Sequence, residues 1–504
     1  MTANTPLATR FTQPTFLNTF TSRLTDYLPT QRWFTSKGKK IATCKVQNAY
    51  GITEDSAIAV VRVSFNDGST EMYQLPLAQL GDVNAQAGYQ KDHPGMVVLK
   101  LPGGPTVVDA VPSTAFRSAL YELIRGQRST GQGLKTDAGR ILNSAPATSP
   151  STVPAIDTSN TAIVYNDEFF FKLFRKLDEG LNPDLELVRF LSERAGFEHC
   201  PPYAGSIGVG EMHDDSYLNL GMMSGKVDNR GDAWGFFQEL TERFYAGDGA
   251  VDDQTLERAN LLGKRTAQMH KSLYKGEAAG AMLRPEPMSP EYRAEITAAA
   301  RKLLNRQMNE LRAKQGELTP AQSELAGHVL GMQTELDGNL RKLADRPMDL
   351  DLIRIHGDYH LGQVLVTKDD FYIIDFEGEP LLSIPERRRK RPALKDVAGM
   401  VRSFHYAARG QLLLNDSYAG RNTAELNRWG ERWYKEVSGA YLTAYYAECG
   451  AAKFLPASEE DRELLLDLFV LEKAVYEVAY ELNSRPAWLA IPLNGVLSVA
   501  GPSH

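Results

Sequence analysis

The stretch His356-Gly-Asp-Tyr-His-Leu-Gly-Gln363, followed closely by Ile373-Ile-Asp-Phe-Glu377, decides the fold of this sequence. Short apolar runs at 352–355, 363–366 and 371–374, joined by polar turns, predict a small group of β-strands around these stretches. The sequence on either side shows the apolar spacing of helices instead. We therefore predict a local β-type platform within a mainly helical region, with acidic side chains beside its strands.

Two aspartates and one glutamine in these stretches suit phosphoryl transfer from ATP. That reaction needs one group to orient and deprotonate the acceptor hydroxyl, and others to hold Mg²⁺ against the phosphates. Asp358 and Asp375 can divide these tasks, and Gln363, five residues after Asp358, can offer a neutral oxygen to the metal. Turn formation is the alternative role for both aspartates. The combination of all three residues favours catalysis.

Composition limits the class of partner. The chain has 504 residues, 42% of them hydrophobic, and 56 Lys and Arg against 63 Asp and Glu give a formal net charge of −7. At about 150 residues per domain, this length predicts two to four folding units. Nucleic acids and anionic membranes attract a basic face, which this chain cannot easily supply. We expect small molecules or proteins as partners, and no nucleic acid.

Cysteine usage and the N-terminus indicate the compartment. Cys44, Cys200 and Cys449 lie far apart in no C-x-x-C pair, which argues against a disulfide framework and a thiolate metal site. The first residues lack the charged start and apolar centre of a signal peptide, and no apolar run approaches the ~20 residues that span a bilayer. We expect a cytoplasmic protein with no membrane partner.

The pattern along the chain predicts its organisation. Residues 1–127 alternate short strands with turns, and residues 128–160 form a connector rich in Gly, Ser, Thr and Pro. Two apolar runs around Asn166-Asp167 predict an antiparallel hairpin, and Asn182-Pro-Asp184 marks the start of a helix. The chain after residue 223 is mainly helical. Predicted helices include 253–273, 290–313, 320–343, 424–449 and 458–482.

The loop at 356–363 resembles the Brenner-type motif of aminoglycoside phosphotransferases and other protein-kinase-like small-molecule kinases, in which a His-Gly-Asp loop ends in Asn. Gln363 replaces that Asn, as in one branch, the maltokinases, whose loop reads His-Gly-Asp-x-His-Leu-Gly-Gln. The sequence is similar to maltokinases over most of its length. Further stretches that carry the resemblance are 28–39, 375–380, 386–389, 394–408, 472–488 and 491–493.

The resemblance implies an α+β, bilobal protein-kinase-like fold in three parts. These are an N-terminal cap subdomain at 1–127, a connector with a β-rich nucleotide-binding lobe at 128–223, and a mainly helical C-lobe at 224–504. The C-lobe would carry the catalytic and sugar-acceptor site. The basic segment 31–40 is interpreted as a structural turn of the cap, rather than a partner surface or a cover over the nucleotide.

The resemblance also assigns the nucleotide side of the site. Lys172 would contact the α- and β-phosphates of ATP, with Glu186 as the ion-pair partner that holds it. No G-x-G-x-x-G loop is present, so hydroxyls and backbone N–H groups of Ser159, Asn160 and Thr161 would cover the phosphates. From the local sequence alone, Lys172 would be interpreted as a solvent-facing lysine on an amphipathic strand.

In maltokinases the acceptor is the anomeric hydroxyl of maltose, which becomes maltose 1-phosphate in glycogen (α-glucan) and trehalose metabolism. The resemblance thus implies ATP, Mg²⁺ and maltose as ligands, with a complex with a trehalose–maltose isomerising enzyme as a further expectation. A sugar pocket needs polar side chains, because an unpaired buried donor or acceptor costs about 1–3 kcal/mol. Candidate sugar contacts are His360, Glu377, Glu379, Asp396, Arg402 and Tyr406.

These candidates have structural alternatives. The charged residues could form a salt-bridge network, and His356 and His360 could shape their loop by hydrogen bonding. The basic run 387–391 is interpreted as a solvated surface rather than a nucleic-acid site. The aromatic residues between 429 and 445 are interpreted mainly as core.

Two other functions fit the same motifs. The chain could phosphorylate another sugar, such as glucosamine, because one scaffold can serve different acceptors. It could also be a non-catalytic sugar or nucleotide sensor, which the presence of the base, both metal ligands and the lysine disfavours.

Overall fold

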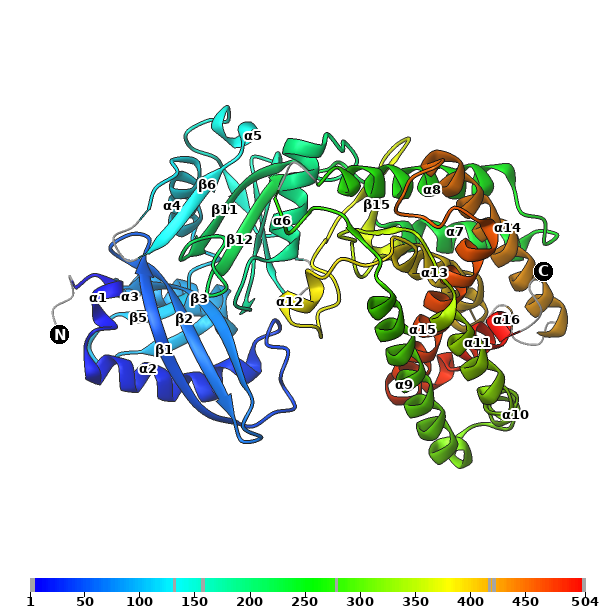
Figure 1. Cartoon of the computed structure of the whole chain (residues 1–504). Coiled ribbons are helices and arrows are strands. Elements are labelled where there is room, and N and C mark those ends of the chain that lie inside the picture. The colour runs from blue at the N-terminus through cyan, green and yellow to red at the C-terminus, as the bar shows by residue number, and fades with distance from the viewer. Residues whose placement is uncertain are drawn as a thin grey trace. The chain divides into compact units, whose positions relative to one another are not determined.

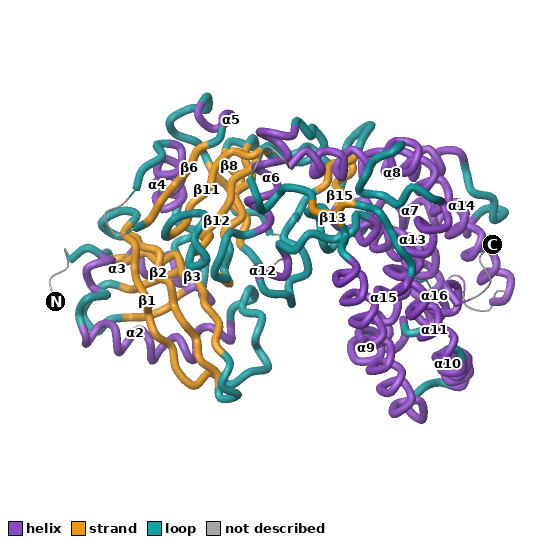
Figure 2. The backbone as a smooth tube through the Cα atoms, viewed as in Figure 1, coloured by secondary structure: helices purple, strands orange, loops and turns teal. Residues whose placement is uncertain are grey.

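The computed structural model describes residues 5–129, 133–155, 159–276, 280–415, 418 and 423–500. The chain forms two compact units. The first comprises Met1–Arg189, Pro201–Lys226 and Ser383–Pro385, and the second comprises Phe190–Cys200, Val227–Leu382 and Glu386–His504. The large sheets belong to the first unit, and long helices dominate the second (Figure 2).

The first sheet is antiparallel, with the order β1-β2-β3-β5-β4 and with β10 paired to β3. Helix α2 (Pro14–Tyr27) packs against it (Figure 1), because Phe16, Phe20 and Leu24, four residues apart, form a fully buried apolar stripe. The strands are β1 (Ile41–Gly51), β2 (Ser56–Phe65), β3 (Thr70–Leu80), β4 (Val97–Lys100), β5 (Thr106–Asp109) and β10 (Lys176–Leu177).

The second sheet of the first unit has the order β6-β11-β12-β9-β8-β7. It contains the predicted hairpin, which is confirmed as β8 and β9. The turn residues Asn166 and Asp167 have φ of +51° and +56°, the left-handed conformation that tight hairpin turns use. The strands are β6 (Leu134–Ala138), β7 (Ser151–Thr152), β8 (Thr161–Tyr165), β9 (Phe169–Leu173), β11 (Tyr203–Val209) and β12 (Leu218–Gly225).

Shorter helices accompany the two sheets. Helix α4 contacts β6 and β11, and α6 begins at Pro183 as predicted. The helices are α1 (Leu7–Arg10), α3 (Val83–Asp92), α4 (Thr114–Arg125), α5 (Arg140–Asn143), α6 (Pro183–Phe190) and α12 (Ile384–Arg387).

Long helices build the second unit. Four of the predicted helices are confirmed, but the helix expected over 320–343 is two helices that meet at Met332, just after Gly331. Glycine weakens a helix by about 1 kcal/mol relative to alanine, which favours the break there. The helices are α7 (Ala233–Ala246), α8 (Asp253–Tyr274), α9 (Pro290–Lys314), α10 (Pro320–Gly331), α11 (Gln333–Asp345), α13 (Leu394–Leu414), α14 (Thr423–Cys449), α15 (Glu459–Ser484) and α16 (Ala490–Ala500).

The predicted β-type platform is present as two short pairs of strands. β15 (Val364–Val366) pairs with β16 (Phe371–Ile373), and β13 (Glu286–Pro287) pairs with β14 (Asp351–Leu352). The strand expected over 352–355 reaches only Leu352, followed by an isolated bridge at Ile353. The platform therefore places the loop at 356–363 directly before β15.

The basic run at 387–391 forms ion pairs on the surface. Both terminal nitrogens of Arg389 contact Glu295, at 2.7 and 2.9 Å, and Lys390 pairs with Glu286. The run is a surface feature, as interpreted, and its ion pairs could not be seen in the local sequence, because α9 and the segment before it supply the carboxylates.

Among the described residues, every helix is too short or too polar to span a bilayer. Cytoplasmic location stays a prediction.

Helices α8 and α14 cross closely, and the aromatic residues of α14 form core there. Trp433, Tyr441 and Tyr445 are fully buried, which confirms the core interpretation for these three. Gly263 of α8 lies against the backbone of α14, where an added Cβ would fall 2.2 Å from the Tyr441 carbonyl oxygen. A glycine is therefore required at this crossing.

Replacing this glycine should destabilise the second unit. We predict that Gly263→Ala lowers the free energy of unfolding by about 1–3 kcal/mol, because the methyl group forces the helices apart. Gly439→Ala is the matched control: this glycine is exposed on α14 with open space around its Cβ, so alanine should be neutral or stabilising by about 0.5–1 kcal/mol. Thermal melting of both variants shows whether Gly263→Ala is less stable than Gly439→Ala. Equal stability of the two variants would contradict the close crossing.

Candidate active site

The loop at 356–363 is shaped by His356. Its Nε2 donates to the carbonyl oxygen of Ile374 at 2.9 Å, and its Nδ1 accepts from the backbone N–H of Asp358 at 3.4 Å. The buried imidazole also packs on Phe376, with ring centroids 4.8 Å apart. The loop-shaping alternative for His356 is therefore confirmed.

A single buried carboxylate anchors this loop. Asp396, in the first turn of α13, accepts the backbone N–H groups of His356 at 2.7 Å and Gly357 at 2.9 Å. His270 of α8 places its Nε2 3.2 Å from the same carboxylate, and its Nδ1 lies 2.9 Å from the Tyr445 hydroxyl. Burial by itself would raise the pKa of Asp396. The hydrogen bond and the charge interaction with His270, followed by weaker interactions with His356 and the Gly357 backbone, lower this pKa below its ordinary value. Asp396 is therefore an anion at neutral pH.

Two glycines bring this loop against the segment that follows β16. Gly357 has φ of +88° and Gly378 has φ of +72°, conformations that other residues rarely adopt. A Cβ on Gly357 would lie 3.2 Å from the Cα of Gly378. A side chain at position 357 would press on the facing segment, whereas one at position 378 would meet Arg387, so the close contact depends on Gly357.

Asp375 and Gln363 meet beside the β15–β16 pair. The Gln363 side-chain amide donates to the Asp375 carboxylate at 3.1 Å. Asp375 has φ of +64°, a strained conformation for a residue other than glycine that is common at functional sites. Carboxylate and amide oxygens are ligands that Mg²⁺ prefers, so this donor set fits a magnesium ion.

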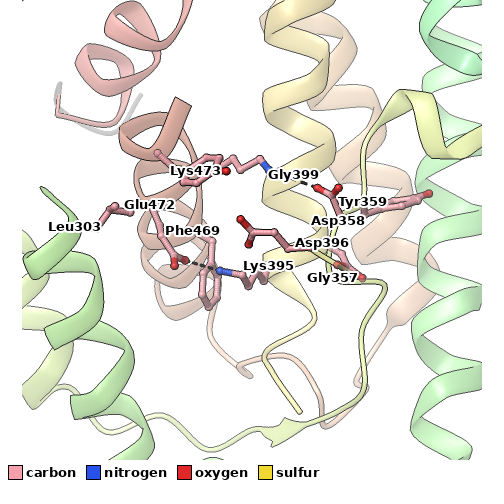
Figure 3. Close-up of a pocket in the computed structure, with 12 residues that line it drawn as sticks. Leu303, Gly357, Asp358, Tyr359, Lys395, Asp396, Gly399, Phe469, Glu472 and Lys473 are labelled. Carbon is pink, nitrogen blue, oxygen red and sulfur yellow. Dashed lines mark hydrogen bonds and ion pairs between the residues drawn. The ribbon is translucent and has the colours of Figure 1, made fainter. Parts of the chain in front are cut away.

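Asp358 lies in a pocket that the second unit forms by itself (Figure 3). Lys473 of α15 points toward Asp358, with its Nζ 3.6 Å from the carboxylate, and Lys395 pairs with Glu472 at 2.7 Å. Tyr476 lines the same pocket. The Asp358 side chain keeps 24% of its surface exposed, so an acceptor hydroxyl can reach it.

The charge of Lys473 is stabilised by its surroundings. Burial would lower the pKa of Lys473, but the charge of Asp358, followed by those of two glutamates, raises it above its ordinary value. The pocket thus holds a protonated lysine beside the proposed base.

The other expected sugar contacts differ in their surroundings. Glu379 lines the pocket, and Glu377 lies on the segment after β16. His360 accepts the backbone N–H of Gly362 at 3.1 Å, and burial lowers its pKa, which favours the neutral imidazole. The loop-shaping alternative for His360 therefore has direct support. Sugar contact by these three residues stays a prediction.

Arg402 and Tyr406, farther along α13, join a buried polar network. Arg402 donates to Glu477 of α15 at 2.7 and 2.9 Å, and the Tyr406 hydroxyl donates to Glu481 at 3.0 Å. The ion pair of Arg402 shows the salt-bridge role that was the alternative for this residue, and the hydrogen bond of Tyr406 adds a structural contact that was not considered. Sugar contact by Arg402, Tyr406 or Asp396 stays a prediction.

On the nucleotide side, the first unit places Lys172 on β9 beside Thr161. Thr161 begins β8 and pairs with Leu173, and Ala162 pairs with Lys172. Ser159 and Asn160 directly precede this strand.

The partner of Lys172 that the structure defines was not expected. Its Nζ lies 3.3 Å from the carboxylate of Asp184, which is buried on α6. Asp184 was not singled out, although it stands in the Asn182-Pro-Asp184 helix start. Glu186, on the same helix, stays a predicted partner.

Residues of α15 were also missed by the sequence analysis. Glu472, Lys473 and Tyr476 lie on a segment that was noted for its helical spacing and its family resemblance, and not as a candidate site. The charged residues Glu472 and Lys473 follow a mainly apolar run at 464–471, and this change of polarity is the sequence signal that could have identified them.

Comparison with known families identifies the class. A model of the maltokinase N-terminal cap domain matches residues 27–112, and a model of the phosphotransferase enzyme family matches residues 155–414, more than half of the chain. The chain belongs to the phosphotransferase enzyme family. Its resemblance to protein-kinase-like small-molecule kinases is thereby confirmed.

Similar proteins include two glucosamine kinases. The enzyme from Streptacidiphilus jiangxiensis is 24% identical over 373 residues, which cover 72% of this chain and 76% of that protein. The enzyme from Mycolicibacterium smegmatis (strain ATCC 700084 / mc(2)155) is 27% identical over 177 residues, which cover 35% of this chain and 39% of that protein.

Solved structures support the fold. A glucosamine kinase in complex with glucosamine, ADP and inorganic phosphate superimposes with a TM-score of 0.66 at 18% identity, covering 94% of this chain and 98% of that one. Crystal form A of a glucosamine kinase superimposes with a TM-score of 0.63 at 19% identity, covering 95% of this chain and 98% of that one. The expected α+β protein-kinase-like fold is confirmed.

Replacing the anchoring carboxylate should slow catalysis without weakening sugar binding. In Asp396→Asn, the amide cannot accept both backbone N–H groups, so the Asp358 loop shifts. We predict a fall in kcat of about ten- to hundredfold, with KM for the sugar unchanged within about twofold. Steady-state kinetics provide the measurement, with Asp337→Asn on α11 as a control that removes another ion-paired carboxylate. A selective rise in sugar KM would instead support a sugar contact by Asp396.

Proposed function

We propose that this phosphotransferase is an ATP- and Mg²⁺-dependent sugar kinase that phosphorylates the anomeric hydroxyl of maltose, giving maltose 1-phosphate. The observation that carries the proposal is the accessible Asp358 carboxylate, which lies in a polar pocket on a loop fixed by Asp396. The maltokinase-type loop sequence at 356–363 and the matching cap domain at 27–112 support maltose as the acceptor.

Asp358 acts as the general base in this proposal. The acceptor hydroxyl enters the pocket and passes its proton to the Asp358 carboxylate as its oxygen bonds to the γ-phosphorus of ATP. The bond from that phosphorus to the β,γ-bridging oxygen breaks, and ADP leaves. Lys473, with its Nζ 3.6 Å from that carboxylate, would hold it in direction. Positioning supplies most of the rate, because phosphoryl transfer requires little covalent assistance from the protein.

Asp375 and Gln363 would hold Mg²⁺, which neutralises charge on the β- and γ-phosphates when bound. Lys172 would contribute a point charge to the α- and β-phosphates, with Asp184 fixing its direction.

Glucosamine is the second candidate acceptor, because similar proteins are named glucosamine kinases. Its ammonium group would have to be accommodated in a pocket that contains two lysines, Lys395 and Lys473. Lys395 is paired with Glu472, and the protonated Lys473 repels a second cation. The lining also carries the carboxylates of Asp358, Glu379, Asp396 and Glu472, so its charge suits either sugar, and the preference for maltose rests on the family resemblance.

A complex with a trehalose–maltose isomerising enzyme is a further proposal, supported by the family resemblance alone. Gel filtration of this protein, alone and mixed with such an enzyme, tests it.

Removing the base should separate catalysis from nucleotide binding. We predict that Asp358→Asn lowers kcat by about 10²–10⁴-fold, because the amide cannot accept the proton, while the Kd for ATP changes little. Coupled ADP-release assays and titration calorimetry provide the two measurements. Near-normal turnover in this variant would refute Asp358 as the base.

A panel of acceptors tests the sugar. We predict that ADP release requires a sugar and has a higher kcat/KM with maltose than with glucosamine. Lys473→Met should lower kcat/KM for maltose by about tenfold and raise the glucosamine-to-maltose ratio, because it removes a cation from the pocket.

Two results of the panel would count against these assignments. If the wild-type protein prefers glucosamine, glucosamine replaces maltose as the proposed acceptor, and the protein is still a sugar kinase. Absence of transfer to any sugar would favour a non-catalytic sensor.

A further inference from the structure

A buried arginine of the second unit joins α13 to α15. Arg402 is only 1% exposed, and its Nε and Nη2 donate to the Glu477 carboxylate at 2.9 and 2.7 Å. Its Nη1 lies 2.6 Å from Nδ1 of His405. Burial, followed by the charge of Arg402, lowers the pKa of His405 well below its ordinary value, so the imidazole is neutral and its Nδ1 accepts this hydrogen bond.

Helix α16 packs closely against the same guanidinium. A Cβ added to Gly495 would lie 2.0 Å from Nη1 of Arg402. This packing leaves the arginine little freedom, so its two hydrogen bonds hold the Glu477 carboxylate in one position.

Glu477 lies one helical turn after Lys473, the lysine that points toward Asp358. Residues four apart on a helix are neighbours, and helical side chains lean toward the N-terminus, so Glu477 reaches back toward Lys473. Both hydrogen bonds from Arg402 use Oε2, which leaves the second oxygen of Glu477 to other partners. Burial would lower the pKa of Lys473, but the charge of Asp358 and then that of Glu477 raise it. Charges of alternating sign therefore run from Arg402 through Glu477 and Lys473 to Asp358.

The pair between Lys473 and Asp358 is loose. Its N···O distance is 3.6 Å, whereas charge-assisted hydrogen bonds of this kind are about 2.7–2.9 Å long. A tight pair would occupy the oxygen that has to accept the proton of the acceptor hydroxyl. The glutamates whose charges act on Lys473, Glu477 and Glu379, attract its ammonium group as well. The position of Lys473 is thus a balance between these carboxylates and Asp358.

We propose that Glu477, held by Arg402, is a positioning residue for catalysis: it attracts Lys473 and keeps it from closing onto Asp358. The lysine then orients the Asp358 carboxylate and leaves it free to accept a proton. Arg402 contributes through Glu477 in this arrangement, without touching the sugar. The inference rests on the proposed function, because it takes Asp358 as the general base.

Steady-state kinetics of Glu477→Gln test the proposal, with the sugar that the wild-type protein phosphorylates most efficiently. The neutral amide attracts Lys473 less, so the lysine closes onto Asp358. We predict that kcat falls about three- to tenfold, with KM for the sugar unchanged within about twofold. Lys473→Met combined with Glu477→Gln should be no slower than Lys473→Met alone, because Glu477 acts through Lys473.

Glu481→Gln is the matched control. Glu481 is also buried on α15, one turn after Glu477, and it accepts hydrogen bonds from Arg485 at 2.6 and 3.0 Å. It lies two turns from Lys473, so the loss of its charge should lower the melting temperature and leave kcat unchanged within about twofold.

A second variant separates catalysis from stability. Glu477→Gln leaves the buried charge of Arg402 without its carboxylate, whereas Arg402→Met combined with Glu477→Leu removes both charges of the pair. The double variant should therefore melt at a higher temperature than Glu477→Gln. Its kcat should nevertheless be as low, because it also lacks the carboxylate that attracts Lys473. This variant also provides the test if Glu477→Gln does not fold.

Any of five results would overturn the inference. They are a wild-type kcat in Glu477→Gln, a selective rise in its KM for the sugar, multiplicative effects with Lys473→Met, an equal loss of kcat in Glu481→Gln, and recovery of kcat in the variant that lacks both charges. Absence of phosphoryl transfer by the wild-type protein to any sugar would instead refute the proposed function itself.

Discussion

The candidate active site depends on one buried carboxylate. Asp396 accepts two consecutive backbone N–H groups of the loop at 356–363, and its own charge is supported by His270 from a different helix. A buried anion without such partners would be costly, so the loop and the helices hold each other in place. The position of Asp358, one residue beyond the second bonded N–H, follows directly from this anchor. The hydrogen bond from His356 to Ile374 then fixes the segment that carries Asp375.

Helices α13 and α15 of the second unit carry two sets of polar contacts. Near the loop, Lys395, Glu472 and Lys473 line an accessible pocket. Farther along α13, Arg402 pairs with Glu477 in the buried interior. The same two helices therefore provide a structural ion pair and the lining of the candidate active site, and solvent access distinguishes them. The overall charge of −7 says little about this site, because the charged side chains that line the pocket, among them Lys473 beside Asp358, set the local field.

Features carried by neighbouring residues could be predicted from the sequence. The β8–β9 hairpin was predicted from two apolar runs around Asn166-Asp167, and long helices were predicted from their apolar period. Asp358, Gln363 and Asp375 could be singled out because one short stretch contains all three, and the structure brings Gln363 and Asp375 into contact. Their catalytic and metal-binding roles stay predictions.

Features that depend on contacts between distant segments could not be predicted. Nothing local distinguishes Asp396, which was a candidate sugar contact, from an exposed helix N-terminal aspartate. Lys473 approaches Asp358 only because α15 packs on α13. In each case tertiary packing assigns the role.

The most direct test of the central claim is the phosphorus NMR spectrum of the products formed from ATP, Mg²⁺ and maltose. The arrangement around Asp358 predicts a new phosphate monoester signal whose phosphorus is coupled to the anomeric proton of the sugar. A spectrum that contains only ADP and inorganic phosphate, or a monoester on another carbon, would contradict transfer to the anomeric hydroxyl.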